Sequence, residues 1–184
     1  MLAAASHSDW KRRTSERVTA PGSRVTIHDR DPELAARLAV AAQHAGVFAE
    51  MSTSSSAADA VGDADVVITM ISFGPDRQQV PADAFGRAGL VVTVDYDMCV
   101  PASVVQDAAL FLVDELGQFL ANRVGPVFGG YPDPAGIMGQ RLDDARPNGR
   151  VVVSHLGVGL ADVVFGDAIL RAAEDQHRGI LLPR

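Results

Sequence analysis

The chain has 184 residues, of which 47% are hydrophobic and 21% are charged, and its formal net charge is -7. This length fits one domain with a substantial core, and the negative charge argues against nucleic acid and anionic membranes as partners. No apolar run approaches the ~18 residues of a membrane span, so we expect a soluble protein.

Residues 1–23 are small, polar and charged, without sustained periodicity, and Pro21-Gly22-Ser23 closes them as a turn. Acidic residues interrupt their basic cluster, and no apolar stretch of a targeting peptide accompanies it. Neither LAAA nor RVTA is long or apolar enough for a central strand. We therefore predict a poorly structured segment over 1–23 and one domain over 24–184.

Regular patterns begin at Arg24. Residues 24–29 (RVTIHD) indicate a strand that ends in an acid. Asp31-Pro32-Glu33 then opens a helix with an N-cap acid and a proline at the first position, and Gly46 ends it. The pattern continues with a short strand (47–51), a short helix (55–61) and an apolar strand (65–69).

Strands and helices keep alternating in the second half of the chain. The predicted segments are a loop (73–81), a strand (90–95), a helix (101–107), a strand (110–114), a helix (118–124), a loop (125–134), a strand (150–154) and a long helix (160–175). Nearly all-apolar strands are typical of parallel sheets buried on both faces. The alternation predicts a doubly wound α/β fold.

The acid-ended strand over 24–29 gives the first indication of function. In a nucleotide-binding βαβ unit, such an acid binds the ribose hydroxyls of NAD, and a G-x-G-x-x-G loop lies about 20 residues earlier. That stretch reads HSDWKRRTSERVTAPGS here and has neither the strand nor the loop. We therefore predict an incomplete Rossmann-like parallel sheet, without its first strand and glycine-rich loop, whose second and fourth strands are unpaired edges.

Several segments occur in a characteristic order: HDRDP (28–32), ADVVITMIS (64–72), AGLVVTVDYD (88–97), LFLVDELGQF (110–119) and HLGVGLADVVFGDAILRAA (155–173). Together they resemble the ornithine cyclodeaminase and mu-crystallin family, over roughly Arg24 to Leu182. The resemblance implies the NAD-binding portion of an enzyme that transfers hydride at the α-carbon of an amino or imino acid, with release of ammonia. The amino-terminal half of the family, whose basic residues hold the substrate carboxylate, has no counterpart here.

Two functional readings follow from this resemblance. One is an ornithine cyclodeaminase-like enzyme, truncated and with low or no activity alone, whose partners are a small amino or imino acid and either a second copy or the missing half. The other is a non-catalytic relative that binds a nucleotide weakly or serves as a protein-interaction module. The expected cofactor is NAD, held weakly or not at all, and the expected compartment is the cytoplasm.

Five residues are candidate cofactor ligands. Asp29 is placed to accept from both ribose hydroxyls and to repel a 2′-phosphate, although Arg30 could pair with that phosphate and leaves NADP open. By resemblance, Thr69 and Ser72 end the strand along which the cofactor passes, and Asp162 lies near the nicotinamide or in a dimer-facing wall. The alternatives are a helix-capping acid for Asp29 and ordinary strand-end hydroxyls for Thr69 and Ser72.

Asp95 and Asp97 are the candidate catalytic residues. The resemblance implies that one aspartate at this strand end acts as acid and base on the substrate amine, and Asp97 lies nearest the family position. Two carboxylates this close would raise the pKa of one of them, which suits proton transfer. The alternative is a charged strand-end turn.

Other reactive groups give weaker indications. A single cysteine, Cys99, excludes an internal disulfide and a CxxC metal site, and we expect it to be a packing residue. No pair of histidines has metal-ligand spacing, so we expect no metal. His155 is the histidine that faces a plausible site mouth. Gly157-Val158-Gly159 fits a tight turn better than a phosphate loop, because Asp162 stands at the third glycine position.

Overall fold

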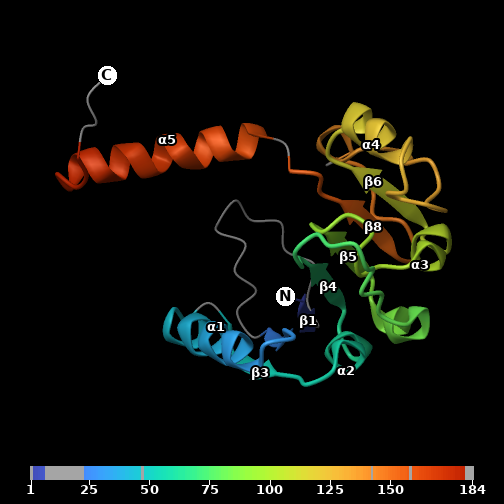
Figure 1. Cartoon of the computed structure of the whole chain (residues 1–184), viewed down its shortest axis with the longest axis horizontal. Coiled ribbons are helices and arrows are strands. Elements are labelled where there is room, and N and C mark those ends of the chain that lie inside the picture. The colour runs from blue at the N-terminus through green and yellow to red at the C-terminus, as the bar shows by residue number, and fades with distance from the viewer. Residues whose placement is uncertain (1, 7–22, 47, 142, 158, 181–184) are drawn as a thin grey trace.

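The computed structural model describes residues 2–6, 23–46, 48–141, 143–157 and 159–180 (Figure 1). Its strands are β1 (Leu2–Ser6), β2 (Arg24–His28), β3 (Glu50–Thr53), β4 (Val66–Thr69), β5 (Leu90–Thr93), β6 (Leu110–Val113), β7 (Gly136–Ile137) and β8 (Val151–Ser154). The helices are α1 (Pro32–His44), α2 (Ala57–Gly62), α3 (Ala102–Gln106), α4 (Leu116–Arg123) and α5 (Gly159–Asp175), with short 3-10 turns η1 (Ala82–Arg87) and η2 (Met138–Gln140).

The strands form one eight-stranded sheet in the order β3-β2-β1-β4-β5-β8-β6-β7. All of them run parallel except β1, which is antiparallel to both of its neighbours. The predicted Rossmann-like α/β class is confirmed. The strand order on both sides of β1 is that of a doubly wound sheet.

Local signals placed the start of α1 correctly. The Asp31 carboxylate accepts from the backbone N–H groups of Glu33 (2.9 Å) and Leu34 (3.4 Å), and proline fills the first helical position. Gly46 follows the helix with φ +64°, a conformation that glycine adopts without strain. Other boundaries moved: the strand expected at 47–51 lies at 50–53, and η1, β7 and η2 were not predicted.

The expected gap in the sheet is filled, so the prediction of a missing first strand is wrong. Leu2–Ser6 pairs with β2 on one side, as in Ala3 opposite Ile27, and with β4 on the other, as in Ala3 opposite Ile68. Backbone N–H and C=O groups make these bonds, so a short segment of small residues can form a central strand. Contrary to the sequence-based expectation, a longer or more apolar segment is not needed. The rest of the predicted amino-terminal segment, residue 1 and residues 7–22, lies outside the described residues.

The main core lies on one face of the sheet, which we call the first face. Strand residues Val67, Val91, Phe111 and Val152 pack there against buried side chains of α2, η1, α3 and α4, among them Val61, Phe85, Val104 and Phe119. The opposite side, the second face, carries a smaller cluster in which Ala35 of α1 packs on Val25 and Ile27. The two faces are therefore covered unequally.

The last helix, α5, extends away from the sheet (Figure 1). None of the closely packed pairs of elements includes it. Its large apolar side chains are exposed, for example Phe165 at 66% and Ile169 at 68%. In the part of the chain that the structure describes, no helix has both the length and the apolar character needed to cross a bilayer.

Candidate functional site

The carboxyl ends of the parallel strands bring polar residues from distant parts of the sequence to one edge of the sheet. Asp29 follows β2, Thr69 ends β4, Asp95 follows β5, Asp114 follows β6 and His155 follows β8. In doubly wound sheets this edge is where ligands bind. Candidate site residues from five strands therefore share one side of the molecule.

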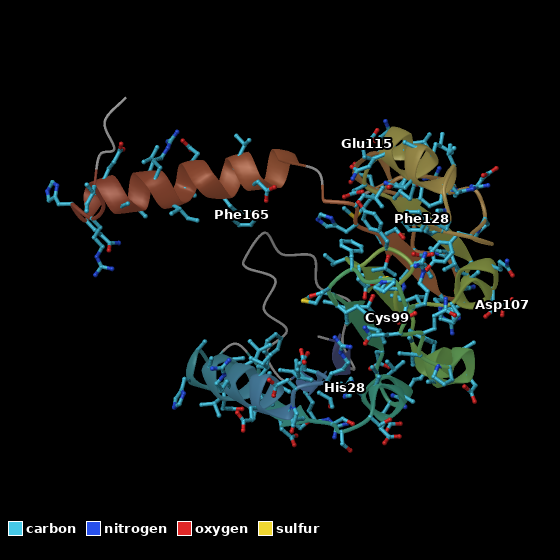
Figure 2. The ribbon with its side chains drawn as sticks, in the orientation of Figure 1. His28, Cys99, Asp107, Glu115, Phe128 and Phe165 are labelled. Carbon is cyan, nitrogen blue, oxygen red and sulfur yellow. The ribbon has the colours of Figure 1, made fainter. Side chains whose placement is uncertain are left out.

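A cavity of about 380 Å³ opens at this edge between the ends of β2 and β4. Its lining includes three of the predicted cofactor residues, Asp29, Arg30 and Ser72, together with His28 and Cys99. Figure 2 labels His28 and Cys99. The structure thus places the hydroxyl of Ser72 in the same cavity as the carboxylate of Asp29 and the guanidinium of Arg30, which are neighbours in the sequence.

Asp29 also stabilises the local backbone structure. Its Oδ1 accepts from the Asp31 N–H at 2.8 Å, which closes the turn between β2 and α1. A carboxylate presents about four lone-pair positions, so this bond is compatible with acceptance from a ribose hydroxyl. The N-cap of α1 is Asp31. The alternative role of Asp29 as a helix-capping acid therefore does not apply.

Asp95 is held in a buried network with Thr69. Asp95 is 1% exposed, and its carboxylate accepts from the Thr69 hydroxyl at 2.6 Å and from the Ile71 N–H at 3.3 Å. Thr69 is fully buried and its hydroxyl is directed to Asp95. The contact that the structure shows for Thr69 is therefore internal, and this residue is not part of the cavity lining.

Two buried, weakly acidic side chains near this edge, Cys99 and Tyr131, have raised pKa values. Burial and the neighbouring Asp95 raise the pKa of the Cys99 thiol far above its ordinary 9.0. Burial, followed by Asp97 and Asp95, raises the pKa of Tyr131 far above its ordinary 10.0, and the Tyr131 hydroxyl donates to the Val100 carbonyl at 2.8 Å. Cys99 is 3% exposed, in keeping with a packing role.

These raised pKa values predict a loss of stability at alkaline pH. The unfolded chain releases the Cys99 and Tyr131 protons above about pH 9 and 10, whereas the folded chain keeps them, so the free energy of unfolding falls as pH rises. Each group contributes a slope of up to about 1.4 kcal/mol per pH unit. Urea unfolding from neutral to strongly alkaline pH measures it. In Cys99→Ala the fall in the free energy of unfolding should begin about one pH unit later than in the unmodified chain. The same pH dependence in both chains would show that Cys99 does not cause this loss of stability.

Asp97 connects two loops. Its Oδ2 accepts from the Arg77 guanidinium at 3.0 Å and from the Phe128 N–H at 2.9 Å, and Arg77 also donates to the Pro126 carbonyl at 3.1 Å. Tyr96 and Phe128 both have φ near +59°, a region that non-glycine residues seldom adopt. Asp97 is thus placed to hold a strained turn against the neighbouring loops.

Sequence reasoning missed the partner of His155. The Asp114 carboxylate lies 3.0 Å from His155 Nδ1, and both of its oxygens are 2.9 Å from the Leu156 N–H. The Gly157 N–H also lies 3.0 Å from Nδ1, so this nitrogen donates to Asp114 or accepts from Gly157 according to its tautomer. The strand 110–114 ends in an acid, as 24–29 does, and that pattern could have identified Asp114.

The remaining predicted residues lie apart from the cavity. Asp162 is exposed near the start of α5 and is not among the cavity-lining residues. Gly157 has φ +83° and Gly159 begins α5, in keeping with a turn between strand and helix, while Val158 lies outside the described residues. Among the residues that the structure describes, no group of three His, Cys, Asp or Glu side chains is arranged to hold a metal ion.

The sheet order and the ligand edge define an α/β protein of Rossmann-like architecture. Among solved structures, the chain is similar to the crystal structure of CmnK, with a TM-score of 0.57 and 20% sequence identity over 91% of this chain. The chain spans 59% of the length of CmnK. At this identity the likeness shows the fold alone. No protein-family model and no curated protein matches the sequence.

Proposed function

We propose that this chain is the nucleotide-binding portion of an ornithine cyclodeaminase-like, NAD-dependent protein that acts on an amino or imino acid. By itself it binds the adenosine end of NAD weakly and has low or no catalytic activity. The observation that carries the proposal is the shared cavity of Asp29, Arg30 and Ser72 at the carboxyl edge of the sheet.

The chemistry of this cavity suits a ribose. Asp29 supplies carboxylate acceptors for the two ribose hydroxyls, at the strand end where such acids act in dinucleotide-binding folds. The Ser72 hydroxyl can donate or accept at the opposite wall. Arg30 offers a positive charge for a phosphate, so NADP remains a candidate beside NAD.

The direction of β1 supports weak binding. A parallel first strand would end at the cavity edge and lead into a glycine-rich loop and a helix N-terminus that hold the pyrophosphate. Here Ser6, the last residue of β1, pairs with Arg24 at the beginning of β2, so the strand ends at the opposite edge. The backbone N–H groups that would bind the phosphates are therefore not delivered by this strand.

The state of the two aspartates supports low activity. A general base must reach the proton that it removes. Asp95 and Asp97 are buried and accept hydrogen bonds from Thr69, Arg77 and the backbone. Either carboxylate would have to give up an internal bond before it could take a substrate proton. Non-catalytic nucleotide binding is the alternative that this geometry favours.

Replacing Asp29 by asparagine tests the ribose assignment. The asparagine side chain keeps an oxygen for the Asp31 N–H but loses the charge and half of the acceptor positions, so we expect the affinity for NAD to fall about tenfold. Amide chemical shifts of residues 29–31 and 72 report binding. The matched control is Asp107→Asn, an exposed acid well separated from His28 (Figure 2). The proposal would be contradicted if the unmodified chain bound NAD with micromolar affinity. It would also be contradicted if NAD shifted these amide signals equally in Asp29→Asn and in the unmodified chain.

A further inference from the structure

A second cavity lies where the parallel strands begin, at the edge of the sheet opposite the cavity that Asp29 lines. Its volume is about 360 Å³, which is within the range of small-molecule sites. A water molecule takes up about 30 Å³ in the liquid, so this cavity has room for a ligand of on the order of ten non-hydrogen atoms. We call it the amino-edge cavity.

Three aliphatic side chains form the apolar part of the amino-edge cavity. Val66, Leu90 and Val151 are the first residues of β4, β5 and β8, and strand pairing places them side by side. All three line the cavity and are only half-buried. They therefore offer apolar surface to a hydrocarbon chain or ring of a ligand.

Two arginines line the cavity beside this apolar part. Arg87 ends η1, and its Nε donates to Asp65 Oδ1 at 3.3 Å. Arg146 comes from the loop before β8, and its Nη2 donates to the Gly89 carbonyl at 3.3 Å. A guanidinium has five N–H groups in a planar fork, so a bond within the protein is compatible with a bond to an anion. Two guanidinium groups and one carboxylate, that of Asp65, leave the lining with a net positive charge.

The backbone around the cavity is paired within the sheet. The N–H groups of Gly89 and Leu90 donate to the Asp65 carbonyl at 2.9 and 3.2 Å, and the Val151 N–H donates to the Gly89 carbonyl at 3.0 Å. These backbone donors are used in the fold, so recognition of a charged ligand falls to the arginine side chains.

A third arginine at this edge has a different role. Arg150 donates to the backbone carbonyls of Ala88 at 3.1 Å and Phe85 at 2.5 Å, and it is not among the residues that line the cavity. These bonds tie the end of η1 to the start of β8. Arg87 and Arg146 are exposed residues at the cavity wall, where a ligand can reach them.

Gly89 makes room for the guanidinium of Arg146. A Cβ atom on Gly89 would lie 2.8 Å from Arg146 Nη2, closer than a real Cβ approaches another atom. Gly89 is not among the glycines with positive φ, so its backbone conformation does not itself require glycine. The glycine therefore keeps open the position that the guanidinium takes at the cavity wall.

We propose that the amino-edge cavity binds a small amphipathic monoanion, a carboxylate on an aliphatic or aromatic body. The ligand carboxylate pairs with the guanidinium groups of Arg87 and Arg146, and its apolar body lies on the first residues of β4, β5 and β8. The net positive charge of the lining favours an anion over an amine of the same shape. This site lies at the other edge of the sheet and is independent of the proposed nucleotide binding.

Titration with octanoate, followed by amide chemical shifts, tests the site. We expect octanoate to shift the signals of residues 66, 89–90 and 151, and octanol, a neutral chain of the same length, to bind at least tenfold more weakly. Arg146→Gln removes one charge and should weaken octanoate binding at least tenfold. The matched control is Arg171→Gln on the projecting helix α5 (Figure 1), which should bind octanoate as the unmodified chain does.

Gly89→Ala tests the position of Arg146 while both arginines are kept. The added Cβ displaces the guanidinium, so octanoate binding should weaken about fivefold with unchanged circular dichroism. The proposal would be overturned by an absence of octanoate shifts at residues 66, 89–90 and 151, by equal affinities for octanoate and octanol, by equal affinities of Arg146→Gln and Arg171→Gln, or by an unchanged affinity of Gly89→Ala. The shifts that NAD causes at residues 29–31 and 72 should be the same in Arg146→Gln and in the unmodified chain, which separates this site from the nucleotide assignment.

Discussion

Replacing Ala4 by proline is expected to lower the free energy of unfolding by about 3 kcal/mol and to cause aggregation. Ala4 lies in β1 and pairs with Thr26 of β2 and Val67 of β4, so the strand joins the two halves of the sheet. Proline removes the backbone N–H and breaks the pairing at the centre of the sheet. Urea unfolding followed by circular dichroism and light scattering measures both effects.

The control for this substitution is Ala4→Ser, which keeps the backbone N–H and adds little volume. It should unfold within about 1 kcal/mol of the unmodified chain, since the backbone hydrogen bonds of the strand are kept. If Ala4→Pro unfolded at the same urea concentration as the unmodified chain and stayed monodisperse, β1 would not be the strand that joins β2 and β4.

Replacing Asp97 by alanine is expected to lower the free energy of unfolding by about 3 kcal/mol. The carboxylate is the acceptor for the Arg77 guanidinium and the Phe128 N–H, and its loss leaves a partly buried cation and a buried donor without this acceptor. Asp97→Asn keeps an oxygen for the Phe128 N–H and should lose about half as much. Urea unfolding at neutral pH compares the two variants.

Asp133→Ala is the matched control for Asp97→Ala, because Asp133 also pairs with an arginine but is 83% exposed. Exposed ion pairs contribute about 0–1 kcal/mol, so this variant should be nearly neutral. An Asp97→Ala variant as stable as Asp133→Ala would show that Asp97 does not hold the loops, and would return it to the catalytic role that the family resemblance implies.

Sequence reasoning succeeded where the information is local. The N-cap at Asp31, the glycine after α1 and the apolar runs of β4 and β5 depend on neighbouring residues, and each is at or within two residues of its predicted place. The parallel order followed from the alternation of strands and helices. Asp29 was assigned as a cofactor ligand from the acid-ended strand pattern and Ser72 from the family resemblance, and both residues line the cavity at this edge.

The partners of the polar groups could not be predicted in this way. Whether Asp97 faces a substrate or Arg77 depends on how the loop 73–81 returns over the sheet, which no local pattern encodes. The same holds for Thr69, whose hydroxyl meets Asp95, a residue 26 positions later in the chain. These contacts arise from tertiary packing, because burial obliges each polar group to find an acceptor or donor wherever the chain supplies one.

The sequence by itself determined the α/β class, the strand ends that meet at the ligand edge and the acid at the end of β2, because periodicity, caps and turn residues act over a few positions. Only the tertiary structure decided that Leu2–Ser6 closes the sheet and that it runs antiparallel. A strand of small residues has no pattern that distinguishes it from a loop, and its place comes from the backbone groups of β2 and β4, which need partners on both sides. That direction places Ser6, the last residue of β1, beside Arg24, at the edge opposite the carboxyl ends of the parallel strands.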